Sequence, residues 1–155
     1  MLLTPRAFRL TLGFFVIMAD KITLRVVTPS QMLLDEEVDE VTAPGELGEF
    51  GVLPNHIAFL STLVPGEMSY KQGTSKTTLA VSGGYAEVLD NVMTVLAPAA
   101  EFAAEIDVTR AQQAKERAEN RLAELNREEK DWDAAEAALQ WAVVRLQVAS
   151  KEARR

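Results

Sequence analysis

The sequence lacks most of the residues that build reactive or cross-linked sites. Its 155 residues include no cysteine and a single histidine. The absence of cysteine excludes a disulfide framework, a cysteine zinc site and a thiol nucleophile. One histidine cannot form a histidine-rich metal centre, and no metal site is predicted.

Positive charge is also scarce, with 16 Lys and Arg against 23 Asp and Glu and a formal net charge of −7. Non-specific nucleic-acid binding requires cations that neutralise phosphates, so that function is disfavoured. An apolar fraction of 48% is enough for a folded core. The length fits one domain or two small ones.

Glycine and proline are missing from the last third of the chain. All 8 glycines lie at or before Gly84 and all 6 prolines at or before Pro98. Charge divides in the same way: residues 20–104 carry 4 basic and 12 acidic side chains, whereas residues 105–155 carry 10 and 11. We therefore expect a β domain over 20–104 and a helical domain over 105–155, preceded by an extension over 1–19.

The extension has two arginines followed by a mostly apolar run, Leu10–Met18. This pattern resembles a secretory signal, but the run has about half the length of a membrane span and no clear cleavage site. Met18-Ala19-Asp20 instead reads as a translation start. The leading expectation is an upstream start chosen in error, so that the functional chain begins at Met18. The alternatives are a signal peptide over residues 1–17 and an ordered or flexible extension.

Short β-branched runs separated by turn residues fill the β domain. Asp90-Asn91 is typical of a tight type I′ hairpin turn, and the polar stretch 72–75 predicts a second hairpin. Pro65-Gly66 is expected to turn the chain between two strands. Acidic residues 35–40 predict a solvated edge that resists aggregation. Strands spaced about 8–12 residues apart indicate an antiparallel β-sandwich or barrel.

The helical domain predicts an antiparallel α-helical hairpin, which gives an α+β fold with two segregated parts. Asp107 is a good N-cap candidate. Two stripes recur at helical spacing: Ala111, Ala114, Ala118, Leu122 and Leu125, then Trp132, Ala135, Leu139, Ala142, Leu146 and Ala149. A buried alanine methyl contributes about 0.8 kcal/mol, against about 1.5–3 kcal/mol for a leucine or valine side chain. The helices should pack closely but weakly, either as a mobile element or as a permanent hairpin.

No catalytic constellation is present. The glycines at 45, 48 and 51 lack the Lys-Ser/Thr pair of a phosphate-binding loop. His56 lies in a predicted turn without a nearby nucleophile or second ligand, which favours a structural or contact role. The acidic run 35–40 lacks the ligand spacing of a calcium loop. No catalytic residue is therefore predicted.

Residues 41–63, followed by Pro65-Gly66, closely resemble the signature of the epsilon subunit of bacterial F-type ATP synthases. Residues 81–88 match a second stretch of that family, and residues 106–119 are similar to its C-terminal helical domain. The resemblance covers the chain from Asp20 onward. It implies a central-stalk subunit that links the gamma subunit to the c ring and couples proton translocation to ATP synthesis.

The resemblance also implies a location and a regulatory role. The subunit would be peripheral, at the cytoplasmic face of the bacterial inner membrane, with no transmembrane span and no catalysis of its own. Its helix pair would contact the alpha and beta subunits transiently and inhibit ATP hydrolysis. The alternatives are a stand-alone β-sandwich binding module or, if residues 1–17 are a signal, an exported protein.

Two sets of site residues follow from the resemblance. One set faces gamma and the c ring: Glu49, Phe50, Gly51, Val52 and His56. The other fits a weakly bound regulatory ATP, with no cofactor required: Glu101, Ile106, Asp107, Arg110, Ala111 and Arg117. Arginine suits bidentate phosphate contacts. ATP-sensing relatives place several arginines in the second helix, whereas this chain offers Arg145 alone before Arg154 and Arg155.

Overall fold

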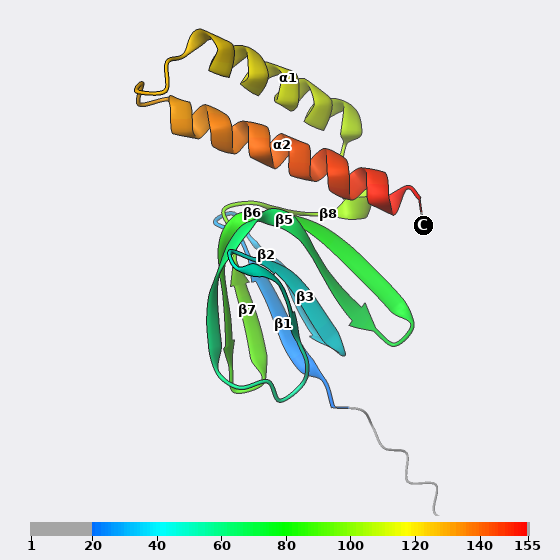
Figure 1. Ribbon diagram of the computed structural model, residues 1–155. Coiled ribbons are helices and arrows are strands. Elements are labelled where there is room, and N and C mark those ends of the chain that lie inside the picture. Colours follow the sequence, from blue (N-terminus) through cyan, green and yellow to red (C-terminus); the bar gives the residue numbers. More distant parts are fainter. Residues whose placement is uncertain (1–19, 155) are drawn as a thin grey trace, which may run out of the picture.

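All strands precede the two long helices in the part of the chain that the structure describes, residues 20–154 of a computed structural model (Figure 1). The strands are β1 (Ile22–Val27), β2 (Met32–Val38), β3 (Glu40–Gly45), β4 (Gly48–Val52), β5 (Phe59–Gln72), β6 (Ser75–Leu89), β7 (Val92–Leu96) and β8 (Ala100–Phe102). A 3-10 turn (Ala103–Glu105) then leads to α1 (Val108–Glu124) and α2 (Trp132–Glu152). The predicted fold class is confirmed, while the expectations for residues 1–19 lie outside the described residues.

The sheet is an open sandwich and not a closed barrel. Its strand order is β2-β1-β7-β6-β5-β3-β4, with β8 paired to β6. The β1–β7 pair is parallel and the other pairs are antiparallel. The acidic strand β2 lies at one end of this order, as expected for a solvated edge. A single apolar core, including Leu24, Met68 and Val95, fills the sandwich.

The predicted turn at Pro65-Gly66 is wrong, because β5 continues through both residues to Gln72. Pro65 pairs with Ser82 on β6, and the Gly66 backbone lies against the Pro44 side chain. The hairpin bends here and does not turn back on itself. The bend involves β6, where Gly83 and Gly84 have positive φ values of 106° and 110°. The long β5–β6 hairpin therefore stays continuous while it bends.

The predicted tight turns and helix cap are confirmed. Asp90 and Asn91 have φ values of 48° and 60°, the left-handed pair of a type I′ turn. The Asp107 Oδ1 accepts a hydrogen bond of 2.9 Å from the backbone N–H of Arg110. Alanines line the α1–α2 contact at most of the predicted positions, and Ala111 and Ala142 are almost completely buried. Ala149, the last alanine of the predicted stripe, packs with the sandwich-facing cluster instead.

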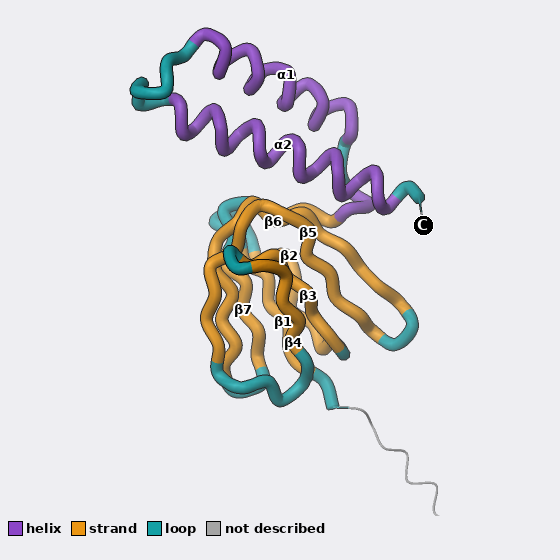
Figure 2. Tube along the Cα trace, viewed as in Figure 1, coloured by secondary structure: helices purple, strands orange, loops and turns teal. Residues whose placement is uncertain are grey.

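Helix α2 also has a second buried face that the sequence reasoning missed. Figure 2 shows α2 between α1 and the sandwich. Its Val144 and Val148 pack with Ala80 of β6 and with Ile106. We call the full set the docking seam: Ala80, Ala103, Ile106, Val144, Val148 and Ala149. The helix pair is thereby fixed to the sandwich through α2.

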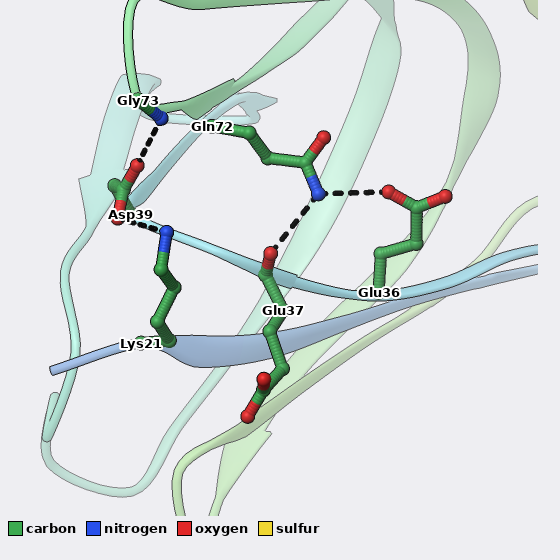
Figure 3. A network of polar contacts seen from close by, with 6 residues as sticks. All are labelled: Lys21, Glu36, Glu37, Asp39, Gln72 and Gly73. Atoms are coloured by element: carbon green, nitrogen blue, oxygen red, sulfur yellow. Dashed lines mark hydrogen bonds and ion pairs between the residues drawn. The ribbon is translucent and has the colours of Figure 1, made fainter.

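Side chains join β2 to the β5–β6 turn without a strand ladder (Figure 3). Asp39 accepts a 2.6 Å hydrogen bond from the backbone N–H of Gly73 and pairs with Lys21 Nζ at 2.7 Å. The Gln72 amide donates to Glu36 Oε2 at 2.8 Å and to the Glu37 carbonyl at 3.0 Å. The Lys21 ammonium, and then the Gly73 N–H, lower the pKa of Asp39.

A side chain at Gly84 should destabilise the sandwich. A Cβ there would overlap the Leu96 carbonyl oxygen, and the positive φ is costly for L-residues. We expect Gly84→Ala to lower the free energy of unfolding by about 2–4 kcal/mol, measured by chemical denaturation. Gly51→Ala is the control, because its Cβ would meet Val41 O at an ordinary 3.9 Å. Equal losses in the two variants would contradict this reading of the bend.

Asp39→Asn should lower the denaturation midpoint at pH 7, because the ion pair with Lys21 is lost. The folded-state pKa of Asp39 is depressed, so its contribution is complete above the pKa of the unfolded side chain, about 3.9. That contribution disappears as pH falls further, through the folded-state pKa. The gap between variant and wild type should therefore close in acid. A gap that stays constant down to pH 2, or one equally large for Asp90→Asn, contradicts the assignment.

Candidate functional site

Strand β4 and the following turn 53–56 form an exposed edge of the sandwich, which we call the contact edge. Glu49 and Gly51 are exposed on it. Phe50 is half-buried and meets the Phe59 ring edge-on at 5.1 Å. The Val52 side chain is fully buried in the sandwich core and points away from any partner. As the end of the strand order, β4 presents backbone groups and alternate side chains outward.

His56 closes the turn that follows β4. Its backbone N–H donates to the Leu53 carbonyl at 3.2 Å, and its Nδ1 lies 2.8 Å from the Ile57 carbonyl oxygen. The imidazole also meets the Phe59 ring edge-on at 5.7 Å. These contacts hold a half-buried imidazole at one corner of the contact edge, so His56 both shapes the turn and forms part of its surface.

Asn91 positions the turn from the neighbouring hairpin. Its Oδ1 accepts a 2.8 Å bond from the Asn55 backbone N–H, while its Nδ2 donates to the Lys21 carbonyl at 2.7 Å. The Asn55 side chain adds a 2.9 Å bond to Asp20 Oδ2. The sequence indicated Asn91 only as a turn former. Figure 1 places the loop that contains this turn at the end of the sandwich away from the helices.

Exposed apolar side chains surround the contact edge. Leu47, at the β3–β4 turn, is completely exposed, and Leu53, Ile57 and Leu60 are 57%, 79% and 69% exposed. Leu47 and Leu60 also line a hollow of about 470 Å³ that is formed by residues 45–50 and 59–62. Gathered apolar side chains on a surface mark interaction sites. Sequence reasoning did not identify these exposed apolar side chains. Leu47, a leucine within the glycine-spaced turn, was the available signal.

A second hollow, of about 340 Å³, opens along the helix pair and is rich in arginine. We call it the arginine hollow; its lining residues are Ala114, Arg117, Ala118, Arg121, Ala135, Ala138, Trp141, Ala142 and Arg145. Arg121 also pairs with Asp131 at 3.2 Å, and the Arg145 guanidinium lies 5.9 Å from the Trp141 ring centre. Three guanidinium groups over a largely alanine floor favour an anionic ligand.

The predicted ATP residues fall into two groups. Arg117 lines the arginine hollow, and Glu101 reaches its rim by binding Arg145. The other four lie at the start of α1, outside the lining: Ile106 and Ala111 are buried, Asp107 caps the helix and Arg110 is exposed. The structure therefore brings two of the six to the hollow and adds Arg121, Trp141 and Arg145.

The described residues were also compared with the requirements of a metal site and of a membrane-spanning helix. Between residues 20 and 154, no group of three or more His, Asp or Glu side chains is placed to hold a metal ion. Over the same range, no helix combines the length and the hydrophobicity needed to cross a lipid bilayer.

Comparison with known proteins gives matches over both parts of the fold. Residues 21–103 match the family model described as "ATP synthase, Delta/Epsilon chain, beta-sandwich domain", and residues 104–150 match the corresponding "long alpha-helix domain". An ATP synthase epsilon chain of Syntrophobacter fumaroxidans is 57% identical over 134 residues, which cover 86% of this chain and 99% of that one. The epsilon chain of Geobacter sulfurreducens is 50% identical, over 89% of this chain and all of that one.

Two solved structures also match the chain. A chain in the Euglena gracilis mitochondrial ATP synthase (OSCP/F1/c-ring) matches with a TM-score of 0.67 and 26% identity, over 99% of this chain and 100% of that one. A chain of the Tetrahymena thermophila mitochondrial ATP synthase central stalk and c-ring has a TM-score of 0.54. That match covers 86% of this chain and 96% of the other at 18% identity, so it concerns the fold alone.

Together, the fold and the sites define a two-part protein, a β-sandwich with an exposed contact edge that carries a docked helical hairpin. The chain belongs to the delta/epsilon chain family of ATP synthases. The resemblance seen in residues 41–63 and 81–88 is thereby confirmed. Family membership favours the rotor-subunit expectation over a stand-alone module. The roles of the individual site residues stay predictions.

Proposed function

We propose that this chain is the epsilon subunit of the central stalk of an F-type ATP synthase. Its sandwich binds the gamma subunit and sits on the c ring, and it thereby helps to couple proton translocation to ATP synthesis. The observation that carries the proposal is the match of both domains, over nearly the whole length, to proteins named ATP synthase epsilon chain. The Euglena neighbour, from an assembly that contains F1 and the c-ring, supports the same partners.

The contact edge is the surface proposed for these partners. Glu49 and the exposed backbone of Gly51 face outward, while Phe50 and His56 frame the same surface. Leu53 and Ile57 add exposed apolar area beside them. Polar pairs at the rim of such an interface mainly set register and association rate, whereas buried apolar anchors supply most of the affinity.

The chain acts as a non-catalytic subunit, and the catalysis belongs to the assembly. Its proposed location is peripheral, at the cytoplasmic face of the bacterial inner membrane. Its only histidine is engaged in a turn, with Nδ1 2.8 Å from a backbone carbonyl oxygen. The loop that follows β4 lies at the end of the sandwich away from the helices (Figure 1), which suits contact with a partner on that side.

The helix pair is the proposed regulatory element. Its internal contact is built largely of alanine, with Ala111, Ala118, Ala135 and Ala142 buried. Each such methyl contributes about 0.8 kcal/mol, so the two helices hold each other weakly. Strong helix formers keep the segment helical once it has separated. The separated helices would contact the alpha and beta subunits transiently and inhibit ATP hydrolysis.

Removing the hairpin should remove inhibition but not assembly. We expect the full chain to inhibit ATP hydrolysis by an epsilon-depleted catalytic head, and a chain that ends after Asp107 to inhibit it markedly less. The shorter chain keeps β8, which pairs with β6, so its sandwich should still bind gamma in a pull-down. Equal inhibition by both chains would contradict the role of the helices. Failure of the full chain to bind gamma at micromolar concentration would contradict the whole proposal.

A regulatory nucleotide is a second proposal, supported by the arginine hollow. Arg117 and Arg121 offer guanidinium groups for phosphates, Arg145 adds positive charge beside them while it stays bound to Glu101, and Trp141 offers an aromatic ring for a base. The volume of about 340 Å³ lies at the lower end of the range typical of ligand pockets, about 300–1,000 Å³. These features fit a weakly bound ATP that holds the two helices together.

Arg117→Ala should weaken ATP binding about tenfold in a calorimetric titration of the full chain, since one charge-assisted phosphate contact is lost. Lys130→Ala removes the same charge from the exposed α1–α2 loop and should change the affinity less than twofold. The absence of heat at millimolar ATP, or equal losses in the two variants, would reject the nucleotide site. Arg110→Ala tests the remaining motif; unchanged affinity there would remove Arg110 from the site.

A further inference from the structure

Three side chains form one row across β5, β6 and β8 beneath helix α2. Ala80 of β6 is the register partner of Glu67 on β5 and of Glu101 on β8. Its neighbours Leu79 and Val81 lie in the sandwich core, so Ala80 faces the opposite side and joins the docking seam. The row therefore presents a carboxylate, a methyl group and a second carboxylate to the helix.

Helix α2 carries two cations that reach these carboxylates. Arg145 donates to Glu101 from Nε at 2.7 Å and from Nη2 at 3.4 Å. Lys151 Nζ donates to Glu67 Oε2 at 2.7 Å. The cations are six residues apart, or about 9 Å along a helix. The carboxylates are two strand spacings apart, about 9.5 Å. The axial distance between the cations thus matches the distance between the carboxylates. The cations are about 120° apart around the helix axis, so they flank the buried stripe of Val144 and Val148 from its two sides.

Burial shows which of the two pairs is stronger. The side chains of Arg145 and Glu101 are 13% and 26% exposed, whereas those of Lys151 and Glu67 are 60% and 22% exposed. Partly buried pairs with two hydrogen bonds are screened less by water than exposed pairs. The Arg145 guanidinium is also held near the Trp141 ring. The first pair should therefore contribute most of the directional attraction between α2 and the sandwich.

We propose that Glu101–Arg145 and Glu67–Lys151 form a two-point ionic latch that holds the helical hairpin against the sandwich. The latch sets how often α2 leaves the docking seam. Three of the six seam residues are alanines, Ala80, Ala103 and Ala149, and they offer little apolar area to fix one position of the helix, although Trp141 packs beside them. The ion pairs therefore decide the register of α2 on the sandwich. The proposal deepens the regulatory role given above and rests on that role for its biological meaning, but not for its test.

The test uses thiol accessibility, because the full chain has no native cysteine. Val148→Cys places a reporter in the docking seam, where the side chain is 2% exposed. Ala86→Cys places a second reporter in the fully buried sandwich core. The rate of maleimide labelling under native conditions, without nucleotide, measures opening of the seam at the first position and unfolding of the sandwich at the second.

Glu101→Gln should raise the labelling rate at Val148→Cys about tenfold, as expected for loss of a partly buried ion pair. Lys151→Met should raise it about two- to fivefold, because that pair is more exposed. Neither change should alter the rate at Ala86→Cys. Glu119→Gln is the matched control, since it neutralises a carboxylate whose pair with Lys115 lies within α1. The double exchange of Glu101→Arg with Arg145→Glu should recover most of the protection.

Two results would overturn the latch. One is a rate at Val148→Cys that is the same for Glu101→Gln and Glu119→Gln. The other is an equal rise at Val148→Cys and Ala86→Cys, which would show loss of the whole fold instead of undocking. A separate measurement concerns the proposed function: Glu101→Gln should strengthen inhibition of the catalytic head. Faster labelling without stronger inhibition would leave the latch standing and count against the inhibitory role.

Discussion

The fold depends on the continuity of the β5–β6 hairpin. Its two strands are 14 and 15 residues long, and β3, β7 and β8 pair with them along their length. The bend at Gly83 and Gly84 lets the same strands serve the sandwich core and the surface beneath α2. Because successive side chains of β6 point to opposite faces, Leu79 lies in the sandwich core and Ala80 lies beneath α2. One hairpin thus carries both the rigid part and the support for the helix pair.

The two ends of the molecule differ in the strength of their contacts. The contact edge is held in place by Asn91, whose side chain bonds to the turn and to the residue before β1, and by the edge-to-face contact of the Phe50 and Phe59 rings. The helix pair is held by a small apolar cluster and by two ion pairs. Such a division suits a rotor subunit with one end permanently engaged and the other free to respond.

Much of this arrangement could be predicted from local patterns. The Asp90-Asn91 turn, the Asp107 cap and the alanine stripes follow from short-range rules, and residues 41–63 indicated the family. Contacts between distant segments could not be read in this way. Glu101 pairs with Arg145, which is 44 positions away in the sequence. The position of Ala80 beside Glu67 depends on the register of the β5–β6 pair. Pro65-Gly66 misled because a proline inside a long strand looks locally like a turn.

The central claim is that the helix pair leaves the sandwich while the sandwich stays anchored. It is tested most directly by spin-label distances in the assembled ATP synthase, with labels at Thr74→Cys in the β5–β6 turn and Gln147→Cys on α2, both exposed positions. We expect two distances, one that matches the docked helix and a longer one whose share changes with the bound nucleotide. A single distance, equal to the docked value under every nucleotide condition, would contradict it.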